Sequence, residues 1–419
     1  MKALVALALM AAAGPAAASP ALERVIVVGR AAPDRPWTDA ATEARPGDHA
    51  ELAVVAIAHD GKKRVVLADA TVAPLTLGGR RVVDRDRRAL TALGEVEVRW
   101  SIVEPHGFRV TDAPNGATSS YYSNVSTERG DFGRWLGYDH IDYYETAQGP
   151  WQTGAVARRV PAVVASAEPD AVQVDGVGTV RYKAELRLPS GVVVASPGAE
   201  ATDAFGLLPA VHRVSIRGDD DFMGWLSAYL LVPEVFGSAG GGRNHQTERF
   251  TGADCADVMV GALRRSGRTE VTYASVAALT RTARVISEPV IVDDGGHPAR
   301  PIEGVARGDL IRIDYGGSLT GHTPRGWDHV AALWEDRSDP DGPFRGGADG
   351  RLDGFDLVIH MGHPRLVIEP LAEQTPATID VLRWRSTRAR PRPPPPRATT
   401  SITGRDVRAS RPHGSVRAS

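Results

Sequence analysis

Short runs rich in β-branched and aromatic residues recur from about residue 22 to residue 215, and they restrict the fold of this chain more than any other feature. Several runs alternate apolar and polar residues, as Val96-Glu97-Val98-Arg99-Trp100 does, which is typical of half-buried strands. Turn signals such as Asp60-Gly61 separate them. Evenly spaced short strands predict a β-rich, sandwich-like N-terminal domain. The expected strands cover residues 24–28, 50–58, 64–67, 96–103, 179–188 and 211–217.

The strand pattern is interrupted between about residues 113 and 152 by a cluster of aromatic residues. Aromatic rings in such an insertion can stack on sugar rings, or they can bury one another in a small core of their own. The second interpretation is the commoner one, because aromatic residues usually serve packing. The cluster consists of Tyr121, Tyr122, Phe132, Trp135, Tyr138, Tyr143, Tyr144 and Trp151.

The 419 residues of the chain are too many for one ordinary core and predict two domains with tails. Gly218-Asp219-Asp220-Asp221 marks a change of pattern, after which helical and then strand-like segments continue, so we expect a second domain over 218–385. The final stretch, 386–419, contains four consecutive prolines among many Arg and Ser residues. Few of its residues are apolar, so we expect a disordered tail.

The first residues have the three parts of a secretory signal peptide. Lys2 is a positive n-region, 3–13 is a short apolar stretch, and Ala16-Ala17-Ala18 fits a cleavage site. We therefore expect a signal peptide over 1–18 and an exported protein, periplasmic or extracellular. No run is long enough to span a bilayer, so stable membrane insertion is not expected. The formal net charge of −2 provides no overall basic field for nucleic acid.

Cys255 is the only cysteine of the chain. Exported proteins often pair their cysteines in disulfides, and a lone thiol has no intramolecular partner. Such a thiol is either reactive or buried as a small apolar side chain, and composition does not distinguish the two.

Helix signals surround Cys255. Thr251 followed by Asp254 matches a capping box, and Gly267 is well placed to end the helix. Cys255 then lies in the first turn, on the side of the apolar stripe. The positive end of a helix dipole stabilises a thiolate, so we expect the pKa of Cys255 to be lowered, as a nucleophile requires.

Downstream histidines provide a base for this nucleophile. A strand over 329–335 begins at His329, and a strand over 356–361 contains His360. Consecutive antiparallel strands bring such residues side by side, and a helix packed across the sheet could bring Cys255 to His329. A cysteine nucleophile needs a base of this kind and usually a third group that orients it.

The order of these segments resembles the NlpC/P60 cysteine peptidases, which are papain-like enzymes that cut peptide stems of bacterial cell walls. The resemblance covers about residues 225–385. It implies an α+β papain-like fold for this region, Cys255 as nucleophile, His329 as general base and His360 as the residue that orients His329. It rests on Val232-Pro233-Glu234-Val235-Phe236-Gly237, Asp254-Cys255, Gly308-Asp309-Leu310, His329-Val330 and Ile359-His360.

Three departures from the family pattern accompany the resemblance. Ala256-Asp257 stands where the family has Ser-Gly, and Glu234 stands where it has a Tyr that lines the oxyanion side. The loop between the two histidines is long and acidic, which leaves calcium binding or an ordinary surface loop as alternatives. His363 is an alternative to His360 as third residue.

The leading hypothesis is therefore an exported hydrolase that cleaves amide bonds in peptidoglycan stem peptides through a thioester. Two alternatives remain. A catalytically impaired domain could only bind the cell wall, and an amidase or acyltransferase could act on another amide or on a lipid. No metal or organic cofactor is implied, and the oligomeric state stays open.

Overall fold

The computed structural model describes residues 20–106, 122–128, 130–154, 157–160, 176–239, 245–316 and 326–386. The chain divides into two units, Met1–Trp384 and Arg385–Ser419, and the helices and strands of the described residues all belong to the first. The expected signal peptide over 1–18 lies outside the described residues. So do residues 113–121 of the aromatic insertion and nearly all of the expected tail.

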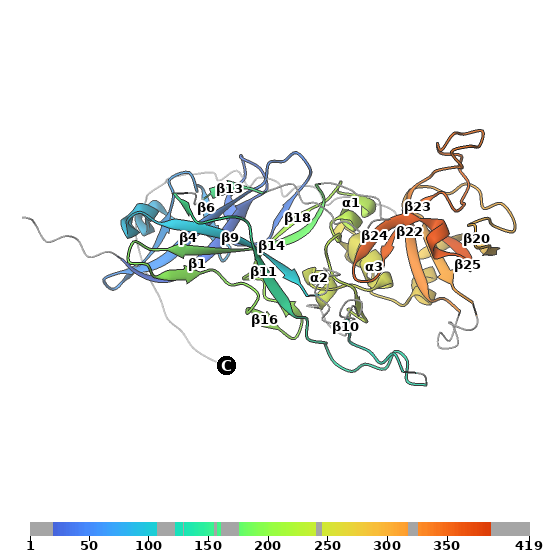
Figure 1. The fold of residues 1–419 in the computed structure, drawn as a ribbon, viewed down its shortest axis with the longest axis horizontal. Helices are drawn as coiled ribbons and strands as arrows, with labels where there is room; N and C mark the ends of the chain where they lie inside the picture. Colours follow the sequence, from blue (N-terminus) through green and yellow to red (C-terminus); the bar gives the residue numbers. More distant parts are fainter. Residues whose placement is uncertain are drawn as a thin grey trace, which may run out of the picture. The chain divides into compact units, whose positions relative to one another are not determined.

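The first sheet of the N-terminal region has the strand order β7-β6-β2-β1-β4-β5-β8, and β13 also pairs with β4 (Figure 1). Its two longest strands, β1 and β4, run antiparallel along their whole length. The strands are β1 (Ala21–Arg30), β2 (Trp37–Thr38), β4 (Glu51–Asp60), β5 (Lys63–Ala68), β6 (Leu75–Leu77), β7 (Arg80–Arg81), β8 (Arg87–Ala89) and β13 (Ala157–Arg159).

The second sheet has the order β11-β9-β14-β18-β3, with β12 paired to β9 and β15 to β14. Antiparallel pairing joins β9, β14 and β18, and β3 runs parallel to β18. The strands are β3 (Thr42–Ala44), β9 (Glu97–Pro105), β11 (Tyr143–Ala147), β12 (Gln152–Thr153), β14 (Gly178–Arg187), β15 (Val193–Ala195) and β18 (His212–Ile216).

The two sheets share one hydrophobic core. Val25 and Val27 from the first sheet pack in the same cluster as Trp100, Tyr182 and Val214 from the second. The alternating patterns predicted this arrangement, since every second residue of each strand faces the core. All six expected strands are present, as β1, β4, β5, β9, β14 and β18.

The aromatic insertion joins the N-terminal region to the segment that precedes Cys255. Its strand β10 (Tyr122–Ser123) pairs in parallel with β19 (Val235–Phe236). Tyr122 packs with Ile141 and Val235 in a small cluster. The insertion therefore buries part of its apolar surface, as the packing interpretation expects. A further hairpin is formed by β16 (Thr202–Asp203) and β17 (Gly206–Leu207).

A six-stranded sheet, with every pair antiparallel, dominates the region after residue 218. Its order is β20-β25-β21-β22-β23-β24. The helix α3 (Cys255–Arg265) packs against β22 and β23 (Figure 1). The strands are β20 (Ala283–Val292), β21 (Leu310–Asp314), β22 (His329–Glu335), β23 (Leu357–Met361), β24 (Leu366–Pro370) and β25 (Ala377–Trp384).

The α-helices are few and short. Besides α3 they are α1 (Phe222–Ser227) and α2 (Gln246–Arg249). Short 3-10 helices supplement them: η1 (Asp84–Asp86), η2 (Leu90–Leu93), η4 (Val276–Arg281) and η5 (Leu371–Gln374). In the described part of the chain, no helix has both the length and the apolar composition needed to cross a membrane.

The expectation of an α+β papain-like domain over 218–385 is wrong. Strand accounts for 42% of the structure and helix for 12%, and the β-rich character expected for 22–215 continues in the described residues after 218. The helical segments stay short because Pro and Gly interrupt them, as at Pro233 and Gly237. The longer runs of this region, such as 283–292 and 377–384, are rich in Val and Ile and favour strands.

Candidate active site

The helix α3 places Cys255 at its first residue, directly after the cap. Asp254 is the N-cap residue, and its side chain accepts a hydrogen bond of 2.7 Å from Asp257 N–H. Cys255 lies in the first turn, as predicted. The cap itself differs from the prediction, because Thr251 donates instead to the carbonyl oxygens of Phe205 and Gln246.

Cys255 is half-buried, and its surroundings are acidic. Burial is the main reason that the pKa of this thiol lies well above its ordinary value, and the charges of Asp254, Asp257 and Glu234 raise it further. The prediction of a lowered pKa is therefore wrong. The helix dipole acts on Cys255, but desolvation and three nearby carboxylates outweigh its effect of about 0.3–1 kcal/mol.

Two of these carboxylates are themselves buried and share a hydrogen-bonded network. Ser238 Oγ donates to Asp257 Oδ2 at 2.8 Å, and Asp254 N–H donates to Ser238 Oγ at 3.0 Å. Burial raises the pKa of Asp254 and, together with the charge of Asp254, raises that of Asp257 well above its ordinary value. Asp257 therefore retains its proton more readily than an exposed carboxyl does, which reduces the negative charge next to the thiol.

His329 and His360 meet across β22 and β23. Ala331 lies opposite His360 in the ladder, and His329 is two residues away from Ala331 on the same face. His329 Nε2 and His360 Nδ1 are 2.9 Å apart, with the two rings at 89°. The predicted pairing of these two strands and of these two histidines is present.

The hydrogen-bond chain continues beyond His360 through residues that sequence reasoning missed. His360 Nε2 lies 3.0 Å from Glu369 Oε1 on β24, and Gln374 Nε2 donates to the same oxygen at 2.7 Å. Tyr315 Oη donates to Gln374 Oε1, and the Tyr315 ring stacks on His329. A signal for Glu369 existed, because it is the acidic residue on the strand that follows His360 in a tight hairpin.

The series of hydrogen bonds from His329 through His360 to Glu369 indicates where the protons lie on the two imidazole rings. Burial opposes ionisation of Glu369, but the hydrogen bond from His360 outweighs it and lowers the pKa, so Glu369 is a carboxylate and accepts from His360 Nε2–H. With the Nε2 proton of His360 directed at Glu369, His360 Nδ1 can accept from His329 Nε2–H, and we assign the two tautomers on this basis. The nitrogen left to act as base is His329 Nδ1. Burial and His360 lower the pKa of His329 well below its ordinary value, which keeps its ring neutral.

Cys255 lies near this histidine chain without a direct bond to it. Within the described residues, no hydrogen bond joins Cys255 to His329. The link is Tyr315, whose pKa is raised by burial and by the charge of Cys255, and whose ring stacks on His329. The helix end and the hydrogen-bonded histidines therefore lie in the same region of the fold, where α3 packs on β22 and β23.

Glu234 borders the same site. Its amide donates to Pro364 O at 2.8 Å, and its carboxylate lies 2.9 Å from His363 Nδ1. His363 thus contacts Glu234, whereas His360 contacts His329. Of the two histidines considered as third residue, the geometry favours His360.

The acidic loop between the two catalytic histidine candidates uses its carboxylates to hold its own backbone. Asp336 accepts from the amides of Asp349 and Gly350, and Asp356 accepts from those of Arg337 and Asp353. Across the described residues, no group of three or more His, Cys, Asp or Glu side chains is arranged to hold a metal ion. These contacts fit the surface-loop interpretation.

Comparison of the chain with family models, with curated proteins and with solved structures gave no match.

Proposed function

We propose that the protein is a cysteine hydrolase that cleaves amide bonds. The observation that carries the proposal is the hydrogen-bonded series His329–His360–Glu369, which leaves His329 Nδ1 as the candidate base on β22, the strand against which the Cys255 helix packs. A nucleophile, a base and a group that orients the base form the arrangement expected of acyl transfer through a covalent intermediate.

In the first step, Cys255 Sγ attacks the amide carbon while its proton moves to His329 Nδ1. The carbon–nitrogen bond then breaks, and the same proton passes to the leaving amine, which leaves a thioester on Cys255. Water, deprotonated by His329, hydrolyses the thioester and regenerates the thiol. Because the thiol has a raised pKa and the imidazole a lowered one, both are neutral before attack, so the proton moves as the bond forms.

The backbone amide of Cys255 supports the oxyanion. It is the first N–H of α3, and no residue of the described chain accepts a hydrogen bond from it. The amide of Asp257 is taken by the Asp254 cap. An unoccupied N–H at a helix start, next to the attacking sulfur, suits the negative charge that develops on the carbonyl oxygen.

The substrate class that we propose is the peptide stem of bacterial peptidoglycan, reached by an exported protein. The support is the ordered set of motifs that resembles the NlpC/P60 peptidases. The aromatic insertion adds to it, since Phe132 and Trp135 are exposed and the nearby Tyr138 has a pKa raised by burial and by Asp257. Exposed rings next to the site offer a surface for stacking on a sugar.

A second candidate is a wall-binding module that has lost turnover. The acidic surroundings of Cys255 favour it, because Glu234 disfavours a thiolate where the resembling family has a tyrosine. Both candidate functions use the same site, but only the hydrolase requires a catalytic reaction there.

Digestion of purified muropeptides followed by mass spectrometry tests the proposal. Wild type is expected to release cleaved stems, Cys255→Ala to release none, and His329→Ala to be strongly impaired. His297→Ala is a matched control, because His297 is an exposed histidine of the same region that contacts Asp293. Identical products from wild type and Cys255→Ala would exclude the hydrolase. Retention on insoluble wall by both proteins would then favour the binding module.

A further inference from the structure

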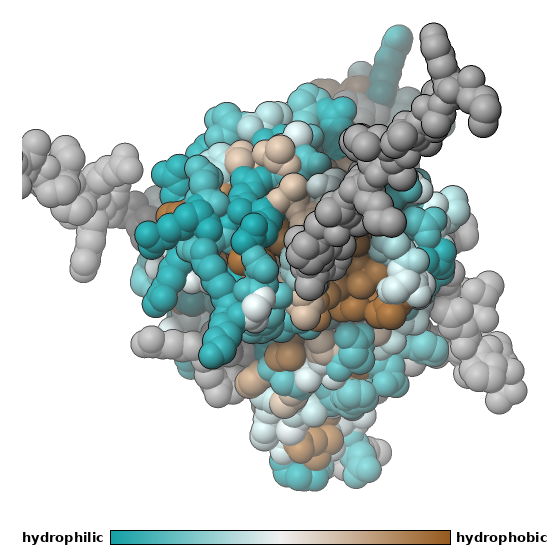
Figure 2. Space-filling view, turned by 90° about the vertical axis from the view of Figure 1, so that its left-hand side faces the viewer, coloured by the Kyte–Doolittle hydropathy of each residue, from teal (hydrophilic) through white to brown (hydrophobic). Residues whose placement is uncertain are grey.

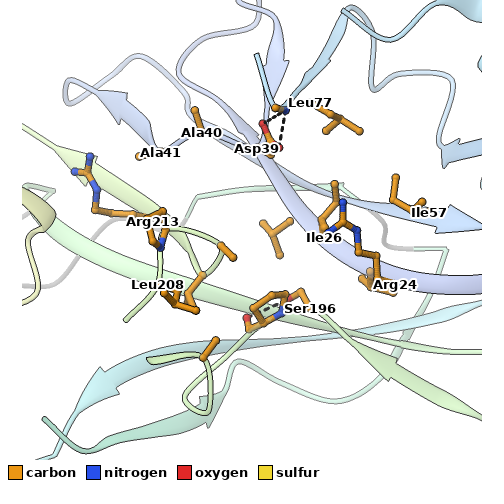
Figure 3. A pocket seen from close by; sticks show the side chains of 18 of the residues that line it. Arg24, Ile26, Asp39, Ala40, Ala41, Ile57, Leu77, Ser196, Leu208 and Arg213 are labelled. Atoms are coloured by element: carbon orange, nitrogen blue, oxygen red, sulfur yellow. Dashed lines mark hydrogen bonds between the residues drawn. The ribbon is translucent and has the colours of Figure 1, made fainter. Parts of the chain in front are cut away.

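A cavity of about 1380 Å³ lies in the N-terminal region, and none of Cys255, His329 and His360 lines it. It is larger than the ~300–1,000 Å³ of an ordinary ligand pocket. Strands β1 and β5 and the 77–83 segment border it on one side, and residues 195–211 border it on the other. In Figure 3, Leu77 and Ile26 lie on one side of the cavity, and Leu208 and Ser196 lie opposite.

One wall of this cavity is apolar and continuous. Ile57 lies opposite Val66 in the ladder, so the two share a face of the first sheet. Ile26, Val66, Leu77 and Val82 pack against one cluster and remain partly exposed. Such an apolar wall favours an alkyl chain over a polar ligand. Elsewhere, on the face of the molecule that Figure 2 shows, apolar residues gather in patches among hydrophilic ones.

The opposite wall adds apolar side chains from the loop that follows β17. Leu207 and Val211 are buried, and Leu208 is partly exposed. Apolar surface on both sides allows a chain to lose most of its contact with water.

Three buried or half-buried arginines line the same cavity. Arg181 is 9% exposed and donates to the carbonyl oxygens of Phe250 and Arg249 at 3.0 and 2.7 Å. No carboxylate of the described chain pairs with it. Burial, together with the charges of Arg213 and Arg249, lowers the pKa of Arg181 to about 10. A buried cation without a counter-charge is destabilising, and a bound anion would relieve it.

Arg249 provides a second, independent indication that this cavity binds an anion. Its Nε is buried and has no hydrogen-bond partner among the described residues, although its Nη1 pairs with Asp203 at 2.9 Å and its Nη2 donates to Leu207 O. Buried N–H groups are nearly always satisfied, so an orphan donor on a cavity-lining residue points to a missing acceptor.

The carboxylates that line the cavity are already engaged. Glu248, the nearest in sequence to Arg249, pairs with Arg264 at 2.7 Å and accepts from Tyr273 at 3.1 Å. Asp86 pairs with Lys63 and Glu200 with Lys183, and Asp39 accepts from the amide of Gly78 within the lining itself. Arg213 is paired with Glu43, but Arg181 and the exposed arginines of the lining without a carboxylate partner leave an excess of positive charge.

We propose that this cavity binds an amphiphilic anion, with a carboxylate or phosphate headgroup at Arg181 and Arg249 and an unbranched alkyl chain along the apolar walls. Because the Nη groups of both arginines already donate to protein oxygens, their positive charge and the Nε–H of Arg249 are what attract the headgroup. Exposed Arg24, Arg80 and Arg81 at the same cavity have no carboxylate partner among the described residues and would attract such a ligand from solution.

Titration calorimetry with the full chain tests this site, with dodecanoate and dodecyl phosphate as probes below their micelle concentrations. Both are expected to bind. Dodecyltrimethylammonium and inorganic phosphate are expected to bind about tenfold or more weakly, because one lacks the anion and the other the chain. Equal binding of the cationic probe, or no binding of either anionic probe, would overturn the proposal.

Two variants locate the binding. Leu208→Trp should fill the space along the apolar wall where the alkyl chain would lie. Val192→Trp is its control, since Val192 is exposed in the same region but outside the cavity. Arg249→Gln should remove the headgroup contact, and Arg187→Gln is its control, since Arg187 pairs with Glu97 away from the cavity. Each test variant should weaken the binding of dodecyl phosphate about tenfold, ~1.4 kcal/mol, and each control should leave its affinity unchanged. Binding that survives Leu208→Trp and Arg249→Gln in folded protein places the ligand elsewhere and refutes the site.

Discussion

His329 Nε2 and His360 Nδ1 are 2.9 Å apart, and this contact engages Nε2 of His329 and leaves Nδ1 as the nitrogen available to the proposed reaction. The orientation depends in turn on Glu369, which holds the far side of His360 at 3.0 Å. Glu369 touches neither Cys255 nor His329 through a hydrogen bond in the described structure. It is therefore a positioning residue for the proposed reaction.

Glu369→Gln tests this role. An amide in place of the carboxylate no longer stabilises positive charge on His360. It can also donate an N–H to His360 Nε2, which would move the His360 proton to Nδ1 and the His329 proton to Nδ1, so that His329 Nδ1 could no longer act as base. We expect kcat to fall about 10–100-fold with KM little changed, as for other outer partners of a catalytic histidine. Stopped assays at several muropeptide concentrations measure kcat and KM separately. Glu373→Gln, a change of the same kind four residues further on, should leave kcat unchanged; an equal loss in both variants would show that general destabilisation is responsible.

Glu234→Gln should make Cys255 more reactive toward alkylation. Removing this charge takes away one of the causes that raise the pKa of the thiol. A fall of one pKa unit increases the thiolate fraction about tenfold at neutral pH. The rate of carbamidomethylation by iodoacetamide, followed by mass spectrometry, measures the change. Wild type should react more slowly than free cysteine, and a wild-type rate above that of free cysteine would contradict the raised pKa.

The pH profile of kcat/KM should show a broad plateau. The acid limb reflects protonation of His329, and because burial lowers its pKa, the base remains available well below pH 6.5. The alkaline limb reflects loss of the thiol proton, and because burial and nearby carboxylates raise that pKa, this limb lies above pH 9.0. A narrow bell with limbs near the ordinary pKa values of His and Cys would instead show that the surroundings shift neither group.

Much of the fold could be predicted from local sequence. The runs at 50–58 and 329–335 alternate or are continuously apolar, and both form strands, because burial on a sheet selects such residues whatever their partners. The order of strands could not be predicted, since β25 lies between β20 and β21 through contacts distant in sequence. The papain-like expectation failed because it transferred a whole fold from a few short motifs.

The site was predictable only in part for a related reason. Cys255 in a first turn and two histidines on adjacent strands follow from local patterns. The raised pKa of Cys255 does not, because it depends on Glu234, brought close by the pairing of 234 with 253. Gln374 and Tyr315 join the histidines only through tertiary structure, so no spacing in the sequence marks them, whereas Glu369 is marked by its place on the strand that follows His360.

His212 should make the N-terminal region sensitive to acid. It is buried between Thr42 and Arg213, with Thr42 Oγ1 at 3.0 Å, and burial lowers its pKa from 6.5 to about 3. A base with a lowered folded pKa contributes full stability above about pH 6.5, and this stability is lost progressively as the pH falls toward 3. The loss is at most about 1.4 kcal/mol per pH unit. Urea unfolding at several pH values should show a smaller slope for His212→Gln, and an unchanged slope would rule out this histidine as the cause.

Arg312 and Asp380 form a bidentate ion pair in the C-terminal sheet, and breaking it should cost more than removing it altogether. They lie opposite each other on β21 and β25, with Nε to Oδ1 at 2.9 Å and Nη2 to Oδ2 at 2.5 Å. Both are almost fully buried, at 5% and 2% exposed. Burial is the main reason that the pKa of Asp380 is raised, so its charge depends on the guanidinium.

Either single variant, Arg312→Met or Asp380→Leu, leaves one buried charge without a partner and should lower the free energy of unfolding by about 3–5 kcal/mol. The double variant buries two apolar side chains instead and should lose less than either single variant. Urea unfolding of the four proteins completes a double-mutant cycle. Additive losses would show that the two residues act independently, and the ion pair would then not stabilise the packing of β21 against β25.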